Sequence, residues 1–317
     1  MSASEFRAPF TAAAVWPEVR PGRFASTLRS SPDGCRCALL GLADDLGVAL
    51  NGGRPGARGG PSAFRAALAR YGVPWDGERR RALDVAIYDA GDIIPAGADG
   101  EQGLLETHAR VERAVAALRE RGMLVLCVGG GHDLSLPALA AVSASLGVPL
   151  GGINLDAHLD VREKVGSGMP FRRLIEGRWL DPRRFVELGL GRFVNDSGDL
   201  EWLRAQGGTA VHADAIFERG LDAHAALDVA ASEGPAFVSI DLDALDQSIA
   251  PGVSAPNPLG LPLRDAARLA EAAGARREIQ HFDLMEFNPS YDVDGHTAKV
   301  AALLFLQFVA GFCQRAP

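Results

Sequence analysis

Residues 153–160 read Ile-Asn-Leu-Asp-Ala-His-Leu-Asp and join the end of an apolar run to three ligand-type side chains. Asp156, His158 and Asp160 are spaced two apart, and a β-strand sends alternate side chains to the same face. All three side chains can therefore point at one spot. Carboxylates and an imidazole that converge in this way suggest a metal site at the end of a strand.

Two further segments fit the same arrangement. Gly129-Gly130-Gly131-His132-Asp133 follows one apolar run, and Ile240-Asp241-Leu242-Asp243 closes another. A cluster of four buried carboxylates is strongly disfavoured by repulsion and desolvation unless cations offset it, and two divalent ions would do so. The alternative is that these aspartates are separate strand-end caps, the role we expect for Asp133. The candidate metal ligands are His132, Asp156, His158, Asp160, Asp241 and Asp243.

The surrounding pattern predicts the fold class. Apolar strands are expected at 37–42, 83–88, 123–128, 149–155, 185–190, 210–212, 236–240 and 279–284. Helices are expected from near Pro61 and at 104–121, 134–146, 198–205, 221–232, 263–274 and 296–312. This alternation predicts a single α/β domain over 35–317, with a mostly parallel, roughly eight-stranded sheet in three αβα layers, after a lead-in segment over 1–34. Ligands bind at the carboxyl ends of such strands, where all three motifs lie.

Composition excludes several functional classes. A net charge of −8 and a pI of about 5.4 provide no positive field for nucleic acid or anionic lipid. Four cysteines without a CxxC pair indicate free thiols in a reducing cytoplasm. The start has no secretory pattern, and the last apolar run, 300–312, is shorter than the roughly 20 residues of a membrane span. We therefore expect a cytoplasmic protein with no nucleic-acid or membrane partner.

The Gly-rich stretch 51–60 leaves two readings open. It matches neither GxGxxG nor the P-loop pattern, which favours an active-site rim loop over a phosphate cradle. The ligand set itself is more informative about chemistry. Carboxylates with two imidazoles and no thiolate suit Mn²⁺ better than tetrahedral zinc. Two such ions can activate a shared water, so we expect metal-assisted hydrolysis.

The motifs GGGHD, DAHLD and SIDLDALD, followed by APGVSAPNPLG, resemble the ureohydrolase family of arginases and agmatinases. The resemblance implies an arginase-like fold, two Mn²⁺ per chain, a small amidine or guanidino substrate and a homo-oligomer. It assigns His132, Asp156, Asp160 and Asp241 to one ion, and Asp156, His158, Asp241 and Asp243 to the other. Asp160 would also orient the attacking water, and Glu286 in MEFNP would pair with the cationic end of the substrate.

The loop 166–172 distinguishes branches of this family. Arginases and agmatinases carry a histidine proton shuttle where this chain has Ser167, and a serine does not change charge near neutral pH. The loop Ser-Gly-x-Pro-Phe-Arg is similar to the formimidoylglutamase branch, which splits N-formimidoyl-L-glutamate into glutamate and formamide. His296 stands where that branch is expected to have arginine.

A substrate with two carboxylates calls for arginines that bind in bidentate fashion. The candidates are Arg54, Arg172 and Arg192, with Asn195 as a polar partner and Ser167 beside them. Two alternatives stay open at this point. One is an agmatinase or guanidino-acid ureohydrolase that releases urea, and the other is a catalytically silent metal-binding relative.

Overall fold

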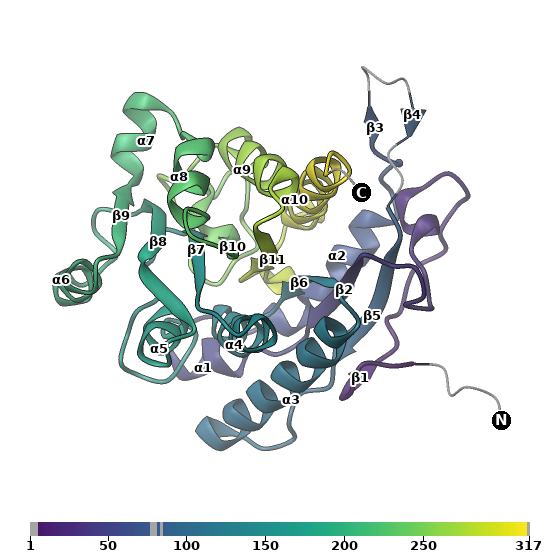
Figure 1. The fold of residues 1–317 in the computed structure, drawn as a ribbon, viewed down its shortest axis with the longest axis horizontal. Coiled ribbons are helices and arrows are strands. Elements are labelled where there is room, and N and C mark those ends of the chain that lie inside the picture. The colour runs from purple at the N-terminus through teal and green to yellow at the C-terminus, as the bar shows by residue number, and fades with distance from the viewer. Residues whose placement is uncertain (1–5, 77–80, 83–84, 316–317) are drawn as a thin grey trace.

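The computed structural model describes residues 6–76, 81–82 and 85–315 and is built around one central sheet (Figure 1). Eight of its strands run parallel, and the short β1 pairs antiparallel with β5 at one edge. The mostly parallel sheet of about eight strands is therefore confirmed. In spatial order the strands are β1 (Thr11–Ala12), β5 (Ile87–Ile93), β2 (Cys37–Leu42), β6 (Leu124–Gly129), β11 (Ile279–Met285), β10 (Ala236–Asp241), β7 (Leu150–Leu155), β8 (Leu180–Leu190) and β9 (Thr209–His212).

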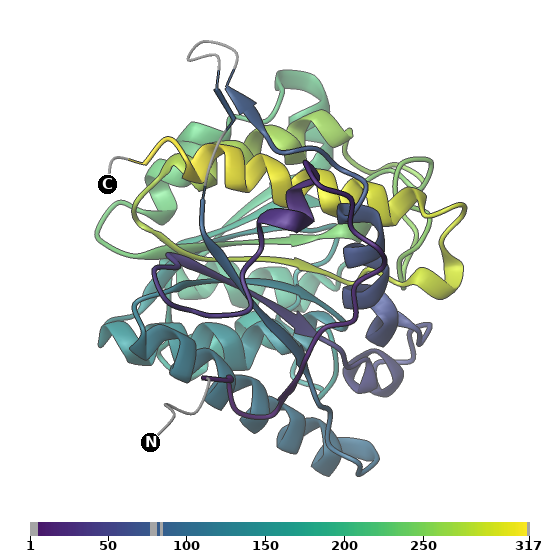
Figure 2. The same ribbon diagram turned by 90° about the vertical axis from the view of Figure 1, so that its right-hand side faces the viewer.

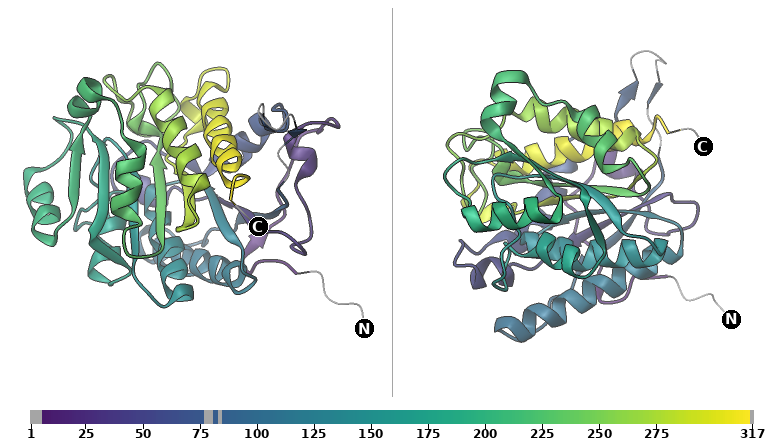
Figure 3. Two further views of the ribbon diagram at one scale, coloured as in Figure 1. Left: turned by 45° about the horizontal axis from the view of Figure 1, so that its top comes forward. Right: turned by 60° about the vertical axis from the view of Figure 1, so that its left-hand side comes forward.

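Helices cover both faces of this sheet, as the views in Figures 1, 2 and 3 show. One face carries α2 (Gly60–Leu68), α8 (Ala223–Ala230), α9 (Leu263–Ala275) and α10 (His296–Phe312). The other carries α3 (Gly100–Glu120), α4 (Ser135–Leu146) and α5 (Pro170–Glu176). Each face has its own buried apolar cluster, and every residue of β2, β6, β7 and β10 is buried. Strands covered on both sides need apolar side chains on both sides, which explains their continuous apolar runs.

The remaining elements are short. They are the helices α1 (Leu46–Leu50), α6 (Ser197–Gln206) and α7 (Ala213–Arg219), the hairpin strands β3 (Trp75–Asp76) and β4 (Arg81–Ala82), and five 3₁₀ turns. The turns span Phe24–Thr27, Ala57–Gly59, His132–Leu134, Leu242–Ala244 and Pro289–Tyr291. Among the described helices, none combines the length and the apolar character that crossing a membrane requires.

Most predicted elements agree with the structure to within a few residues, but one strand is displaced and one predicted helix cap is absent. The strand expected at 83–88 runs over Ile87–Ile93 instead, and its first two positions lie outside the described residues. Asp133 does not cap α4, so that prediction was wrong: its carboxylate Oδ2 lies 2.7 Å from Nε2 of His108 on α3. A buried histidine partner removes this carboxylate from the helix terminus.

Candidate metal centre

The site lies where four neighbouring strands end, in the order β6, β11, β10 and β7. His132 follows β6 through the glycines 130–131, and Glu286 follows β11 directly. Asp241 is the last residue of β10, and Asp156 comes immediately after β7. Because parallel strands present their carboxyl ends at one edge of a sheet, four distant segments deliver their side chains to one place.

The first group of candidate ligands surrounds the imidazole of His132. Its Nδ1 lies 3.0 Å from Oδ2 of Asp160, 3.1 Å from Oδ2 of Asp241 and 3.3 Å from Oδ2 of Asp156. Each of these four residues offers one atom within 4.8 Å of the other three, and all four are buried. Three carboxylate oxygens and one imidazole nitrogen at this spacing fit one divalent cation.

The second group consists of Asp156, His158 and Asp243. Nδ1 of His158 lies 3.3 Å from Oδ2 of Asp243 and 3.4 Å from Oδ1 of Asp156. Asp156 thus presents one oxygen to each group, the arrangement expected of a bridging carboxylate. Asp241, which the resemblance assigns to both ions, belongs to the first group here, and its Oδ1 accepts a hydrogen bond from the Asp243 N–H at 2.8 Å.

The protonation equilibria indicate a site built for positive charge. In the absence of a cation, burial raises the pKa of Asp160 and Asp241, and it raises that of Asp243 to about 6. The attraction of Asp243 raises the pKa of His158 far above its usual range. Burial disfavours protonation of His132, but the close carboxylates of Asp156, Asp160 and Asp241 outweigh burial and raise its pKa as well. Protons on the histidines stabilise the carboxylates where metal ions otherwise would.

Unsatisfied buried atoms support the same reading. Nδ1 of His132, Oδ1 of Asp243 and Oε2 of Glu286 are buried, and none makes a hydrogen bond within the described part of the chain. Buried polar atoms are usually satisfied, so three such atoms in one small region call for a further partner. Cations bound by the two groups, and a substrate beside them, would supply it.

Two of the site residues have unusual backbone geometry. Asp160 has φ of 48° and Glu286 has φ of 61°, a left-handed conformation that residues other than glycine rarely adopt. Hydrogen bonds hold the second of these turns in place: the Glu286 N–H donates to the Gly130 carbonyl, and Glu286 Oε1 accepts from the His132 N–H, both at 2.9 Å. Glu286 thus links the ends of β11 and β6 through these two bonds. Burial raises the pKa of its carboxyl to about 8.

A cavity of about 180 Å³ opens onto this cluster. Its lining includes His158, Asp160, Asp241, Asp243 and Glu286. Asn51, Gly52 and Gly53 form part of its wall, as expected for a rim loop at 51–60. Ser167 lines it as well, and its N–H donates to the Gly47 carbonyl of α1 at 3.0 Å.

Arg162 is the only arginine or lysine among the described residues that line this cavity. Its Nη1 donates to Oδ1 of Asn51 at 3.1 Å, and its N–H donates to the Gly168 carbonyl at 2.8 Å. The sequence reasoning missed this residue, although a signal was present. Arg162 continues the spacing of two that runs through Asp156, His158 and Asp160.

The arginines predicted from the sequence lie elsewhere. Arg54 donates to the carbonyls of Val253 and Ser254, at 2.6 and 3.1 Å, and stacks on Tyr291. The guanidinium of Arg172 pairs with Glu163 and Glu176 and stacks on Trp202. Arg192 is 70% exposed, and its nearest carboxylate is that of Asp214 at 3.7 Å. None of the three is among the residues that line the cavity.

Asn195 has a supporting position rather than one in the cavity. Its Nδ2 donates to the Ala157 carbonyl at 2.8 Å, and its Oδ1 accepts from the Leu159 N–H at 2.9 Å. These two bonds hold the backbone on either side of His158. Asn195 therefore fixes the segment that carries three of the candidate ligands.

Beneath the ligands, a row of buried polar side chains crosses the sheet in register. Glu187 pairs with Asn154, Asn154 with Ser239, Ser239 with Asp283, and Asp283 with Cys127. All five are buried. Ser239 reaches Nε2 of His132 at 2.9 Å, and Nδ2 of Asn154 donates to Oδ2 of Asp156 at 3.2 Å. We call these five residues the polar row; it holds two of the candidate ligands in position.

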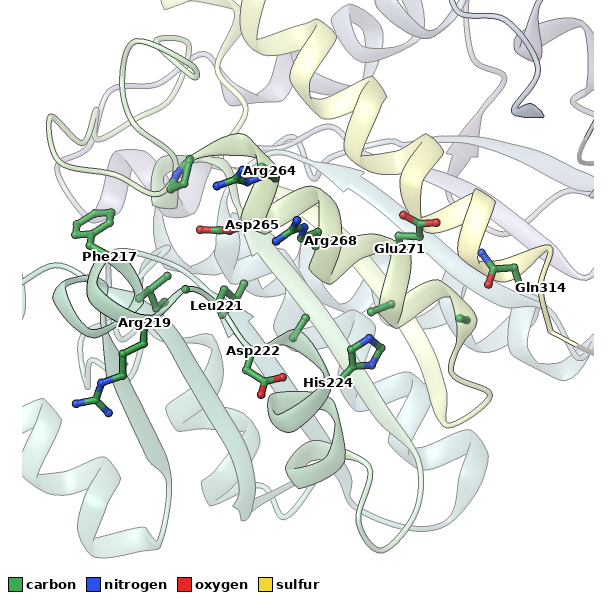
Figure 4. Close-up of a pocket in the computed structure, with 16 residues that line it drawn as sticks. Phe217, Arg219, Leu221, Asp222, His224, Arg264, Asp265, Arg268, Glu271 and Gln314 are labelled. Carbon is green, nitrogen blue, oxygen red and sulfur yellow. The ribbon is translucent and has the colours of Figure 1, made fainter. Parts of the chain in front are cut away.

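A larger hollow, of about 940 Å³, lies between the α7–α8 connection and α9 (Figure 4). Its charged side chains, which include Arg219, Asp222, Arg264 and Glu271, have mixed sign and are spread over a wide opening. It contains none of the six candidate ligands. The smaller cavity, which adjoins the candidate ligands, is therefore the candidate functional site.

Comparisons with known proteins agree with this site. A sequence profile of the Arginase family matches residues 36–311. The formimidoylglutamase of Klebsiella pneumoniae is 38% identical over 278 residues, which cover 85% of this chain and 84% of that protein. The formimidoylglutamase of Ralstonia nicotianae is 33% identical over 300 residues, which cover 89% of this chain and 87% of that one.

A solved structure shows the same fold. The crystal structure of Trypanosoma cruzi formiminoglutamase with Mn²⁺ superposes with a TM-score of 0.84 and 31% identity, covering 91% of this chain and 97% of that one. The profile match alone spans most of the sequence and all six candidate metal ligands. The chain belongs to the Arginase family.

Proposed function

We propose that this protein hydrolyses N-formimidoyl-L-glutamate to L-glutamate and formamide with two Mn²⁺ ions per chain. The observation that carries the proposal is the presence of Arg162 and Glu286 in one cavity with the metal ligands. A guanidinium suits a carboxylate of the substrate, and a buried carboxylate suits its cationic formimino group. The relatives named formimidoylglutamase and the Mn²⁺-bound structure support the same assignment.

The six ligands would divide between two ions. His132, Asp160 and Asp241 would hold one, His158 and Asp243 the other, and Asp156 would bridge them. Carboxylate and imidazole donors without thiolate favour Mn²⁺ over zinc. When bound, the ions supply Lewis acidity that activates water and polarises the formimino group.

The chain's own residues provide binding and proton transfer. Glu286 would bind the formimino group as an amidinium, and this cation would favour the ionised form of a carboxyl whose pKa burial otherwise raises to about 8. Arg162 would hold a substrate carboxylate at the rim. Asp160 would accept the proton of the attacking water. Water adds to the formimino carbon, the C–N bond to the glutamate nitrogen breaks, and that nitrogen keeps the electron pair and takes up a proton.

Ser167 bears on which substrate is used. It lines the cavity where arginases and agmatinases carry a histidine, and its hydroxyl cannot act as a proton shuttle near neutral pH. Expulsion of the glutamate nitrogen therefore falls to the Asp160 proton. This arrangement favours the formimino substrate over the guanidino substrates of urea-releasing relatives.

The test is a product assay on protein loaded with Mn²⁺. Formimidoylglutamate, agmatine, arginine and guanidino acids are supplied separately, and formamide, glutamate and urea are measured. We expect formamide and glutamate from the first substrate and no urea from the others. Asp160→Asn is the control, because it should fold and yet lose most of its turnover. Urea from a guanidino compound without formamide, or no product from any substrate, would overturn the proposal.

We also propose that the protein acts in the cytoplasm as a homo-oligomer. Three of its cysteines, Cys35, Cys37 and Cys127, are free thiols, which suits a reducing compartment. Light scattering on the purified protein checks the assembly. A monomer at micromolar concentration would contradict it.

A further inference from the structure

We propose that Glu187 is a positioning residue of the metal centre. It acts as a neutral acid that donates a hydrogen bond to Asn154 and so fixes the amide that holds Asp156. This inference rests on the proposed metal site but not on the identity of the substrate. Glu187 is the lone charged residue in the apolar stretch Phe-Val-Glu-Leu-Gly-Leu of β8, a signal that the sequence reasoning passed over.

The position of Glu187 is set by strand register. It pairs with Asn154 of β7 at one end of the polar row, and both residues have no exposed surface. The two side chains are close enough for the Asn154 amide to affect the pKa of Glu187. Nevertheless, both carboxyl oxygens of Glu187 and Oδ1 of Asn154 are buried without a donor from any described residue. Two acceptors therefore lie together in the core of the sheet.

A single proton resolves this conflict. Asn154 has its Nδ2 directed at Oδ2 of Asp156, so its Oδ1 is the acceptor left for Glu187. A metal-bound carboxylate can only accept, so Asp156 enforces this orientation of the amide. A protonated Glu187 carries the one donor that the pair needs. Burial is the largest effect on Glu187 and raises its pKa well above its usual range, against a smaller lowering by the nearby Asn154 amide.

Asp283, near the other end of the polar row, is a carboxylate with partners for both of its oxygens. Oδ2 of Asp283 accepts from Ser135 at 2.8 Å and lies 3.0 Å from Nε2 of His281, and Oδ1 accepts from Ser239. These partners hold the pKa of Asp283 below its usual range despite burial. The polar row thus contains an ionised carboxylate behind His132 and a neutral one behind Asp156. Outer partners of this kind orient metal ligands, and their loss typically costs about 10- to 100-fold in metal affinity.

The experiment compares Glu187→Gln with Glu187→Met in otherwise intact protein. Glutamine keeps a neutral donor at the same place, whereas methionine has a similar length and no donor. Mn²⁺ affinity is measured by titration without substrate, and the EPR spectrum of the loaded protein reports on the coupled ions. We expect Glu187→Gln to bind Mn²⁺ within about threefold of the parent and Glu187→Met to bind it about 10- to 100-fold more weakly.

Two further measurements separate positioning from a general loss of structure. The metal-free Tm of Glu187→Met should stay close to that of the parent, because the apolar burial of methionine offsets the hydrogen bond to Asn154 that is lost. Asn154→Leu should weaken Mn²⁺ binding as Glu187→Met does, and the double variant should show little additional loss, since both act through one hydrogen bond.

Two results would overturn the inference. One is a loss of Mn²⁺ affinity in Glu187→Gln as large as in Glu187→Met, which would mean that the negative charge matters. The other is parent-like binding in Glu187→Met. Because binding is read without substrate, a parent protein that binds Mn²⁺ but releases no formamide contradicts the proposed substrate alone.

Discussion

Arg162 and Glu286 give the cavity one cation and one anion that are not in the metal ligand groups. We expect Arg162→Met to raise KM for formimidoylglutamate about 10- to 100-fold, because a charged hydrogen bond contributes about 1.5–3 kcal/mol. The effect on kcat should be smaller, since Arg162 would bind the part of the substrate that does not react. Steady-state kinetics of formamide release measure both constants.

Arg172→Met is the matched control for this prediction. Arg172 was one of the three candidate arginines from the sequence, and its guanidinium pairs with Glu163 and Glu176. KM should change little in this variant. An equal or larger rise in KM for Arg172→Met would show that the substrate carboxylate binds at Arg172 on α5 rather than at Arg162.

The sequence located the cluster of candidate ligands but not the arginine that lines the cavity. Asp156, His158 and Asp160 do converge, but they do so in the loop after β7 rather than by alternating along a strand. Substrate arginines depend on where each long side chain ends and on its competing partners. Arg54 and Arg172 illustrate this, because backbone carbonyls and nearby glutamates bind their guanidinium groups.

The helix α1 forms the rim of the cavity, and its position depends on Gly47. A Cβ at this residue would overlap the carboxylate of Asp133, which His108 holds in place at 2.7 Å. We expect Gly47→Ala to lower the free energy of unfolding by about 1–3 kcal/mol, as overpacking does. It should also raise KM for two reasons. α1 leads directly into Asn51 in the cavity wall, and the Gly47 carbonyl accepts a hydrogen bond from the Ser167 N–H.

The comparison for this prediction is Gly97→Ala. A Cβ at Gly97 meets nothing within 4 Å, so stability and KM should stay close to those of the parent. Denaturant unfolding and formamide kinetics provide both quantities. If Gly47→Ala had the same stability and KM as Gly97→Ala, the position of α1 would not depend on the close contact between Gly47 and Asp133.

The elements that the sequence missed have a common physical feature. α1, α5 and α7 have five to seven residues and give no room for a helical period to show. Long helices and buried strands were predicted well, and α10 was predicted to the residue over 296–312. The strand expected at 83–88 failed because its apolar run continues past Asp89 and Asp92, whose charges are balanced by buried Arg65.

For the whole molecule, Mn²⁺ and protons should compete for one site. The pKa of His132 and of His158 is raised in the metal-free chain, so their stabilisation is complete below about pH 6.5 and is lost as the pH rises through the folded values. The pKa of Asp243 is raised to about 6 and that of Glu286 to about 8, so both groups also stabilise the fold less as the pH rises. Metal-free stability should therefore fall as the pH rises from about 5 to 9.

Mn²⁺ binding should strengthen over the same range, because it no longer displaces protons. The difference in Tm between Mn²⁺-loaded and metal-free protein should widen as the pH rises. Calorimetry in two buffers of different ionisation enthalpy measures the protons released on binding at neutral pH. A constant Tm difference and no proton release would contradict this linkage.

The overall topology shows where sequence reasoning ends. The alternation of strands and helices predicted a layered parallel sheet, but it did not predict the order of the strands within that sheet. β6 and β7 follow one another in sequence, yet β11 and β10 lie between them. That arrangement depends on long-range packing of both faces, and it is what brings His132 and Glu286 next to Asp241 and Asp156.

The polar row has a consequence for how this chain tolerates insertions and deletions. Adding or removing one residue inside β7 or β10 would turn Asn154 or Ser239 to the opposite, apolar face and would aim a leucine or isoleucine at the metal ligands. Loops such as 95–99 carry no such constraint, because no residue there belongs to a strand. Relatives of this protein should therefore differ in length between their elements and remain fixed in length within the four central strands.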